Sequence, residues 1–344
     1  MIPVASSGSR KLHPGDLIDG RYRILGKLAD GGMGTVYLAE HMLIRRRLAI
    51  KLLHAELATD HWMVNRFLNE ATAAGTLGHP HIVESTDMGF TREGIPYIVF
   101  EYLEGCMLTE EIRRLGRLPL RRALVIARQI ASALEAAHHA QIAHLDLKSD
   151  NVFLTHRGYT LDHAKLIDFG ISRFMAVDFE QAPMGILIGT PEFMAPEQVT
   201  SPDTADYRAD IYALGVLLYE MLAGRCPFEG QDLHWVLQRV IHDPPPPLDR
   251  PVPLALERLL FDGLLLKSRE QRPQTMAEIL TVLDELIATT RPEIPRPLDT
   301  FDESYAQLAD ALSQPTWKVE RLFEDAPGQL DGSIEIQVDL DAWP

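Results

Sequence analysis

Hydrophobic and polar residues alternate through much of the N-terminal third of the chain. In 21–41 (RYRILGKLADGGMGTVYLAEH) the alternation lies on both sides of a glycine cluster, which predicts two strands joined by a tight loop. The run 45–54 (RRRLAIKLLH) predicts a third strand, and 94–103 (GIPYIVFEYL) is rich in β-forming residues. Between these strands, 63–77 carries apolar residues at helical spacing. The pattern therefore predicts three strands, one helix and a further strand.

Beyond residue 103 the periodicity becomes helical. The segment 120–140 places one apolar stripe along a helix, formed by Leu120, Leu124, Ala127, Ala131 and Leu134. A small, mainly β N-terminal part is thus followed by a larger, mainly helical C-terminal part, an α+β arrangement whose join lies near 101–106. The space between two such parts is the natural place for a ligand.

Composition narrows the classes of function. The 344 residues are 46% hydrophobic and 24% charged, as in an ordinary globular protein, and the formal net charge of −16 argues against nucleic acid as a partner. Proteins and small ligands are the expected partners. Two cysteines without CxxC spacing support neither a disulfide framework nor a thiolate zinc site, which fits a cytoplasmic location. No apolar run is long enough for a signal peptide or a membrane span.

The segment 291–344 differs from the rest of the chain. It contains twelve acidic and four basic residues, a net charge of −8 on 54 residues. Within it, 301–312 (FDESYAQLADAL) has an apolar helical stripe and 333–340 (SIEIQVDL) alternates like an edge strand. These two patterns favour a tail that docks on the chain's own N-terminal or C-terminal part or on another protein. The alternative is an acidic, solubilising tail.

Several polar residues form a pattern suited to phosphate. Gly31 and Gly34 allow backbone N–H groups to approach an anion, although such turns are common without any ligand. Lys51 ends the apolar run LAIK and is expected to point between the two parts, where Glu70 of the following helix is its candidate partner.

A second group follows the long helix. The stretch 144–151 (HLDLKSDN) supplies Asp146 as a proton acceptor, Lys148 as a cation and Asn151 as an amide ligand for Mg²⁺. Asp168 emerges from a short apolar strand in LIDFGI and predicts a second metal ligand.

In this order and spacing, these elements resemble the signature set of protein kinases. The resemblance runs from about Tyr22 to about Ala288, and GGMGTVYLAEH, IGTPEFMAPEQ and ADIYALGVLLYEML are most similar to bacterial serine/threonine kinases of the eukaryotic (Hanks) type. It implies a bilobal protein-kinase-like fold. The domains are then a flexible segment 1–20, a kinase domain 21–288 with lobes 21–102 and 103–288, and the acidic tail 291–344.

The resemblance also implies roles for individual residues, with ATP and Mg²⁺ as cofactors, Mn²⁺ as an alternative metal, and Ser/Thr hydroxyls of proteins as acceptors. The implied catalytic residues are Asp146 as base, Lys148, Lys51, Glu70 and Thr190, which braces the base. The implied metal ligands are Asn151 and Asp168. The implied nucleotide-binding residues are Leu28, Ala29, Asp30, Gly31, Gly32, Met33, Gly34, Thr35, Val36, Ala49, Lys51, Phe100 as gatekeeper, Glu101, Leu103 and Phe153. Glu197 and Arg272 are implied to form a structural ion pair.

The sequence departs from the family pattern at two positions in these motifs. Ala29 stands where the first glycine of the loop is usual, and Leu145 replaces the arginine that in this family receives a phosphorylated residue. Between Ser172 and Thr190 there is no Ser, Thr or Tyr to phosphorylate. Leu145 therefore indicates the loss of a regulatory switch. The alternative is a pseudokinase that serves as a nucleotide-binding scaffold.

Overall fold

The computed structural model describes residues 11–157, 160–169, 173–174, 190–230 and 232–291. The described strands are β1 (Leu17–Ile18), β2 (Tyr22–Asp30), β3 (Gly34–His41), β4 (Arg47–Leu53), β5 (Ser85–Phe90), β6 (Pro96–Glu101), β7 (Gly105–Met107), β8 (Ile142–Ala143), β9 (Val152–Arg157), β10 (Thr160–Leu166) and β11 (Arg173–Phe174). The described α-helices are α1 (His61–Leu77), α2 (Leu108–Leu115), α3 (Leu120–His139), α4 (Pro196–Thr200), α5 (Arg208–Ala223), α6 (Leu233–His242), α7 (Leu254–Leu259) and α8 (Met276–Thr289).

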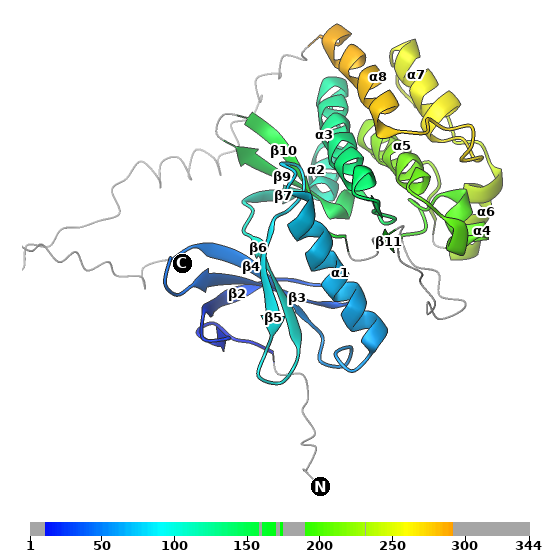
Figure 1. The fold of residues 1–344 in the computed structure, drawn as a ribbon. Coiled ribbons are helices and arrows are strands. Elements are labelled where there is room, and N and C mark those ends of the chain that lie inside the picture. Colours follow the sequence, from blue (N-terminus) through cyan, green and yellow to red (C-terminus); the bar gives the residue numbers. More distant parts are fainter. Residues whose placement is uncertain (1–10, 158–159, 170–172, 175–189, 231, 292–344) are drawn as a thin grey trace, which may run out of the picture. The chain divides into compact units, whose positions relative to one another are not determined.

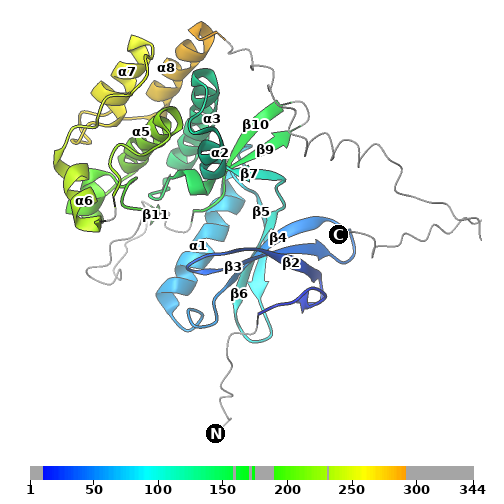
Figure 2. The ribbon, with the colours of Figure 1, turned by 180° about the vertical axis from the view of Figure 1, so that it is seen from behind.

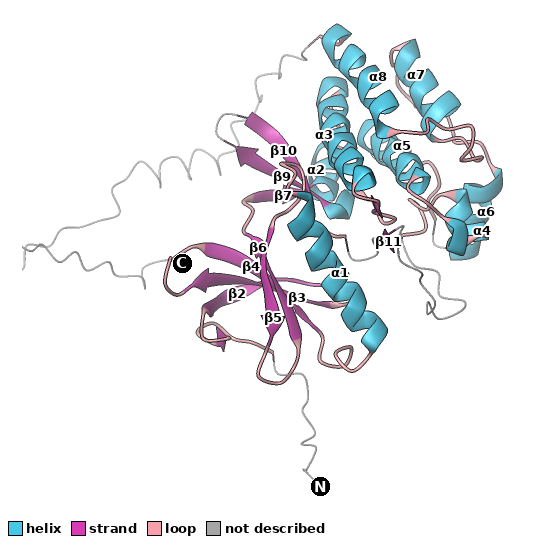
Figure 3. Cartoon of the chain, viewed as in Figure 1, coloured by secondary structure: helices cyan, strands magenta, loops and turns pink. Residues whose placement is uncertain are grey.

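Strands predominate in the N-terminal lobe and helices in the second lobe, as Figure 3 shows. The N-terminal lobe is a six-stranded sheet in the order β1-β2-β3-β4-β6-β5, and α1 lies against β5 and β6 (Figure 1). Two smaller sheets, β10-β9-β7 and β11-β8, belong to the second lobe. The predicted α+β, bilobal arrangement is confirmed. Strand β1 lies within 1–20, the segment predicted to be flexible, and pairs with β2. The domain boundary at residue 21 stays a prediction.

Helix α1 is two residues longer at its start than the pattern predicts. Asp60 provides the reason, because its carboxylate accepts hydrogen bonds from the backbone N–H groups of Trp62 at 2.9 Å and Met63 at 3.4 Å. The helix ends at Gly78, whose positive φ of 52° suits glycine. Glu70 lies on the buried side of α1.

The second lobe is built around α5. This helix is apolar on all sides and buried along nearly its whole length, as expected of a core helix. Figures 1 and 2 show α3 beside α5, with α8 packed on α3. Asp210 and Glu220 are the charged residues in the interior of the α5 sequence, and Asp210 is completely buried. Such a carboxylate requires hydrogen-bond donors.

Candidate active site

Strand β4 and helix α1 bring two opposite charges together. Lys51 Nζ donates to Glu70 Oε1 at 2.8 Å and Oε2 at 2.7 Å, so the predicted pair forms. Asp168 Oδ2 lies 3.8 Å from the same ammonium. Strand β4, helix α1 and the segment that follows β10 thus meet around one cation.

The Lys51–Glu70 pair stays ionic through mutual attraction. Glu70 is only 1% exposed, and burial raises the pKa of Glu70 to about 7, so Lys51 is the group that keeps this carboxylate charged. Burial alone would lower the pKa of Lys51, but the charges of Glu70 and Asp168 raise it above its ordinary value. Lys51 is therefore a permanent cation beside the position proposed for phosphate.

The glycine loop is closed by its own backbone. Gly31 N–H donates to the Gly34 carbonyl at 2.9 Å, so this N–H group stabilises the turn. A Cβ at Gly34 would lie 2.3 Å from the Leu52 carbonyl oxygen, and only glycine fits there. Thr35 Oγ1 also donates to Asp30 across the base of the loop at 2.7 Å. These contacts fix the shape of the loop between β2 and β3.

Several residues implied for nucleotide binding, those expected at the adenine end, lie on strands from both lobes. Ala49 of β4 stands opposite Phe100 of β6, and Val36 of β3 stands opposite Lys51, two residues further along β4. Phe153 comes from β9 of the second lobe. Leu103 packs with Ala49 and Phe100 in one apolar cluster. Met33 joins this cluster and is partly buried, although it lies in the glycine loop.

Four side chains converge in the loop after α3. Lys148 Nζ lies 2.8 Å from Thr190 Oγ1 and 3.2 Å from Asp146 Oδ2, and Thr190 Oγ1 is 3.5 Å from Asp146 Oδ1. Asn151 Nδ2 donates to the Asp146 carbonyl at 2.8 Å. The carboxylate of Asp146 is thereby oriented by a cation and a hydroxyl, as a proton acceptor requires.

Asn151 and Asp168 suit a Mg²⁺ ion that also binds phosphate. The backbone N–H of Ile167 donates to the Asn151 carbonyl at 3.0 Å, which holds Asn151 beside the strand end that carries Asp168. The Asn151 amide nitrogen is used by Asp146, so its amide oxygen remains the ligand atom. Among the described residues, no group of three or more His, Cys, Asp or Glu side chains could hold a metal alone. These two residues fit a metal completed by phosphate oxygens.

The buried carboxylate of Asp210, which the sequence analysis did not identify as a site residue, holds the backbone of the loop that follows α3. Asp210 accepts hydrogen bonds from His144 N–H at 2.8 Å, from Leu145 N–H at 2.7 Å and from His138 Nε2 at 2.8 Å. Leu145 has a positive φ of 63°, a conformation that costs a leucine about 1–3 kcal/mol. Its carbonyl accepts from Gln198 Nε2 at 2.9 Å. Asp210 and Gln198 therefore hold the backbone of Leu145 in a strained shape.

The sequence contained one signal for this support. Asp210 interrupts the apolar run ADIYALGVLLYEML, and a charge in a core helix requires a partner. His138 is part of the same cluster, so it serves as a structural partner of Asp210.

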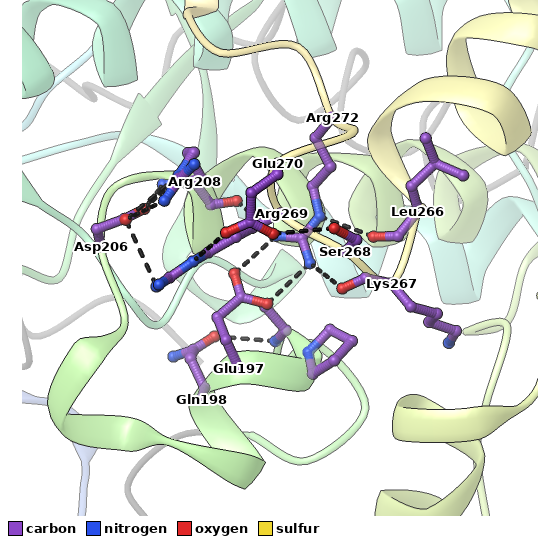
Figure 4. A network of polar contacts seen from close by, with 12 residues as sticks. Glu197, Gln198, Asp206, Arg208, Leu266, Lys267, Ser268, Arg269, Glu270 and Arg272 are labelled. Atoms are coloured by element: carbon purple, nitrogen blue, oxygen red, sulfur yellow. Dashed lines mark hydrogen bonds and ion pairs between the residues drawn. The ribbon is translucent and has the colours of Figure 1, made fainter.

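The predicted ion pair between Glu197 and Arg272 is confirmed and is doubly hydrogen-bonded. Arg272 Nη1 and Nη2 donate to the two Glu197 oxygens at 2.7 Å and 2.8 Å. The remaining guanidinium donors bind the carbonyls of Leu266, Arg208 and Lys267, and Figure 4 shows the network. It joins α4, which follows Thr190, to the segment before α8.

Comparisons with known proteins agree with this geometry. A family model described as the protein kinase domain matches residues 22–282. Serine/threonine-protein kinase Pkn1 of Myxococcus xanthus is 40% identical over 276 residues, covering 78% of this chain and 38% of that protein. Serine/threonine-protein kinase PknA of Mycobacterium tuberculosis is 36% identical over 312 residues, covering 89% of this chain and 70% of that protein.

A solved structure of similar shape is the PknI kinase domain of Mycobacterium tuberculosis, a double mutant, with a TM-score of 0.61 and 27% identity. The match covers 81% of this chain and 100% of that one. The chain spans about a third of the length of Pkn1 and of Pkn2 from Myxococcus xanthus, at 38% and 32%. Within the described part of this chain, no helix combines the length and apolarity needed to cross a bilayer.

Proposed function

Because the chain belongs to the protein kinase domain family, we propose that it transfers the γ-phosphate of ATP to Ser and Thr hydroxyls of protein substrates. The observation that carries this proposal is the arrangement of Asp146, Lys148 and Thr190 together with the ion pair of Lys51 and Glu70. A scaffold without catalysis has no need for an oriented carboxylate beside a cation. The requirement for ATP is the reason to propose a cytoplasmic site of action.

Each residue has a defined task in this reaction. Asp146 accepts the proton of the substrate hydroxyl, and Lys148 neutralises charge on the moving phosphoryl group while Thr190 keeps both in place. Lys51 binds the α- and β-phosphates in the position set by Glu70. Asn151 and Asp168 hold Mg²⁺, which when bound neutralises the phosphate charges.

The test is transfer of labelled γ-phosphate to a generic basic protein in the presence of Mg²⁺, with Asp146→Asn as the matched inactive variant. We expect the native chain to label the acceptor and the variant to lose the activity. Binding of nucleotide by the native chain without any transfer would instead favour the pseudokinase alternative, to which the replacements at Ala29 and Leu145 point.

Activity should not depend on phosphorylation of the activation segment. Thr190 already contacts Lys148 and Asp146, so a phosphate on Thr190 would place negative charge beside the proposed base. Ser172 lies outside the described residues, and Leu145 offers no guanidinium to a phosphate. Phosphatase-treated protein is expected to keep the rate of a mock-treated sample.

Mass spectrometry before and after treatment is the necessary check on this result. If most activity disappeared together with a phosphate on Ser172 or Thr190, the interpretation of Leu145 would be wrong.

The tail 291–344 lies almost entirely outside the described residues, and its docking remains a proposal based on its sequence. Deletion of this segment separates the options. Docking on the chain itself predicts a lower melting temperature or a changed rate on a generic substrate, whereas docking on another protein predicts loss of the physiological substrate only. If the truncated protein matched the full chain in melting temperature, in rate on a generic substrate and in phosphorylation of the physiological substrate, the acidic tail would be a solubilising segment.

A further inference from the structure

Three separate parts of the chain meet at the ammonium of Lys165. Lys165 Nζ lies 2.6 Å from Glu101 Oε1 at the end of β6 and donates to the Ile82 carbonyl, between α1 and β5, at 3.1 Å. Lys165 itself belongs to β10. One side chain of the second lobe thus contacts the segment between the lobes and the segment that follows α1.

Glu101 is held by more than this ion pair. Its carboxylate also accepts from the Glu84 backbone N–H at 2.9 Å, and its own N–H donates to the Glu84 carbonyl at 3.0 Å. The side chains of Lys165 and Glu101 are 12% and 19% exposed, so water screens their attraction only partly. Loss of the ammonium would leave a largely buried carboxylate with one remaining donor.

The position of Lys165 relates this contact to the nucleotide site. In the antiparallel hairpin of β9 and β10, Lys165 stands opposite Phe153, so both side chains lie on the same face. Asp168 follows Lys165 by three residues along the chain. The proposed adenine contacts at Glu101 and Phe153 are therefore connected through Lys165 to the strand that carries the proposed metal ligand.

We propose that Lys165 is a positioning residue for nucleotide binding, which fixes the Glu101 segment relative to Phe153 and Asp168. The inference rests on the proposed function, because it assigns the adenine end of ATP to Glu101 and the phosphate end to Asp168. An ordinary stabilising ion pair is the competing explanation. If Lys165 positions the nucleotide site, its replacement lowers the affinity for nucleotide. If the ion pair only stabilises the fold, its replacement lowers the melting temperature and leaves the affinity unchanged.

The experiment measures the Kd of a fluorescent ATP analogue, the KM values for ATP and peptide, and the melting temperature. Lys165→Met removes the charge and keeps the length of the side chain. The matched control is Lys267→Met. Lys267, like Lys165, is partly buried and donates to a backbone carbonyl, that of Val240 at 2.6 Å, and it lies about 100 residues after β10 in the sequence. Lys165→Arg tests rescue by a conserved charge.

We expect Lys165→Met to raise the Kd about tenfold, with a matching rise in the KM for ATP and none in the KM for peptide. Lys165→Arg should recover most of the affinity, and Lys267→Met should lower only the melting temperature. Glu101→Gln should weaken binding similarly, and adding it to Lys165→Met should cause little further loss, because both changes remove one interaction.

The outcomes separate the two proposals. A native protein that binds no nucleotide would overturn the proposed function, and this inference with it. A native protein that binds nucleotide, with the Kd of Lys165→Met within twofold of it, would overturn this inference alone. Equal rises in Kd for Lys165→Met and Lys267→Met would also overturn it, because general destabilisation would then explain the effect.

Discussion

Replacing Asp168 by alanine is expected to lower kcat for γ-phosphate transfer by about a thousandfold or more, because positioning and charge neutralisation supply nearly all the catalysis in this chemistry. The fold should persist. The Asp168 side chain is 40% exposed, and Lys51, whose ammonium lies 3.8 Å from it, retains Glu70 as a partner. Transfer from labelled ATP and the melting temperature are the two measurements, and only the first should change strongly.

Asp284→Ala is the matched control for this substitution. Asp284 of α8 is a half-exposed aspartate paired with Arg128 on the surface, and its loss should leave kcat unchanged. Activity of Asp168→Ala within tenfold of the native rate would contradict the role assigned to Asp168.

Lys51→Met should abolish transfer equally but should not leave stability untouched. The reason is that Glu70, the partner of Lys51, is fully buried. Without Lys51 the pKa of Glu70 would rise further, since burial is no longer opposed by a cation. We therefore expect a lower melting temperature for Lys51→Met, which Glu70→Gln in the same chain should partly restore.

Arg272→Ala should cause the largest loss of stability, about 3–5 kcal/mol in the free energy of unfolding. The Arg272 side chain is completely buried, and its removal leaves Glu197 without its cation and the carbonyls of Leu266 and Lys267 without a donor. Urea unfolding with an unchanged m-value is the appropriate measurement. Figure 4 shows the Arg272 guanidinium bonded to Glu197 and to the carbonyls of Leu266 and Lys267.

The control for Arg272→Ala is Arg117→Ala. Arg117 pairs with Asp249 at 3.2 Å, and both side chains are about half exposed, so the loss should stay below about 1 kcal/mol. Equal effects of the two substitutions would show that burial does not determine the strength of the Glu197 pair.

Sequence patterns predicted the elements that depend on local periodicity. The expected strand 94–103 is β6 at Pro96–Glu101, and the expected helix 120–140 is α3 at Leu120–His139. Their ends differ by one or two residues because caps and strand partners, which lie elsewhere, decide where hydrogen bonding stops. The resemblance to kinases supplied the residues of the site, and the structure brings Lys51 to Glu70 and Lys148 to Asp146.

Contacts between distant residues were not predictable in this way. Lys165 appears in the sequence as an ordinary polar residue of a strand, and its partner Glu101 lies 64 residues earlier. Nothing in the local pattern around 165 or 101 specifies the other. The positive φ of Leu145 was equally hidden, because it arises from hydrogen bonds to Asp210 and Gln198 and not from any turn-forming residue.

The anchoring of the catalytic loop by Asp210 has a consequence for protein synthesis. Leu145 and His144 precede Asp210 by 65 and 66 residues, so the ribosome releases the loop well before the residue that gives it its shape. A strained backbone cannot persist without the hydrogen bonds that offset its cost. During translation, the nascent chain is therefore expected to acquire Asp146 in its working orientation only after α5 has emerged and packed.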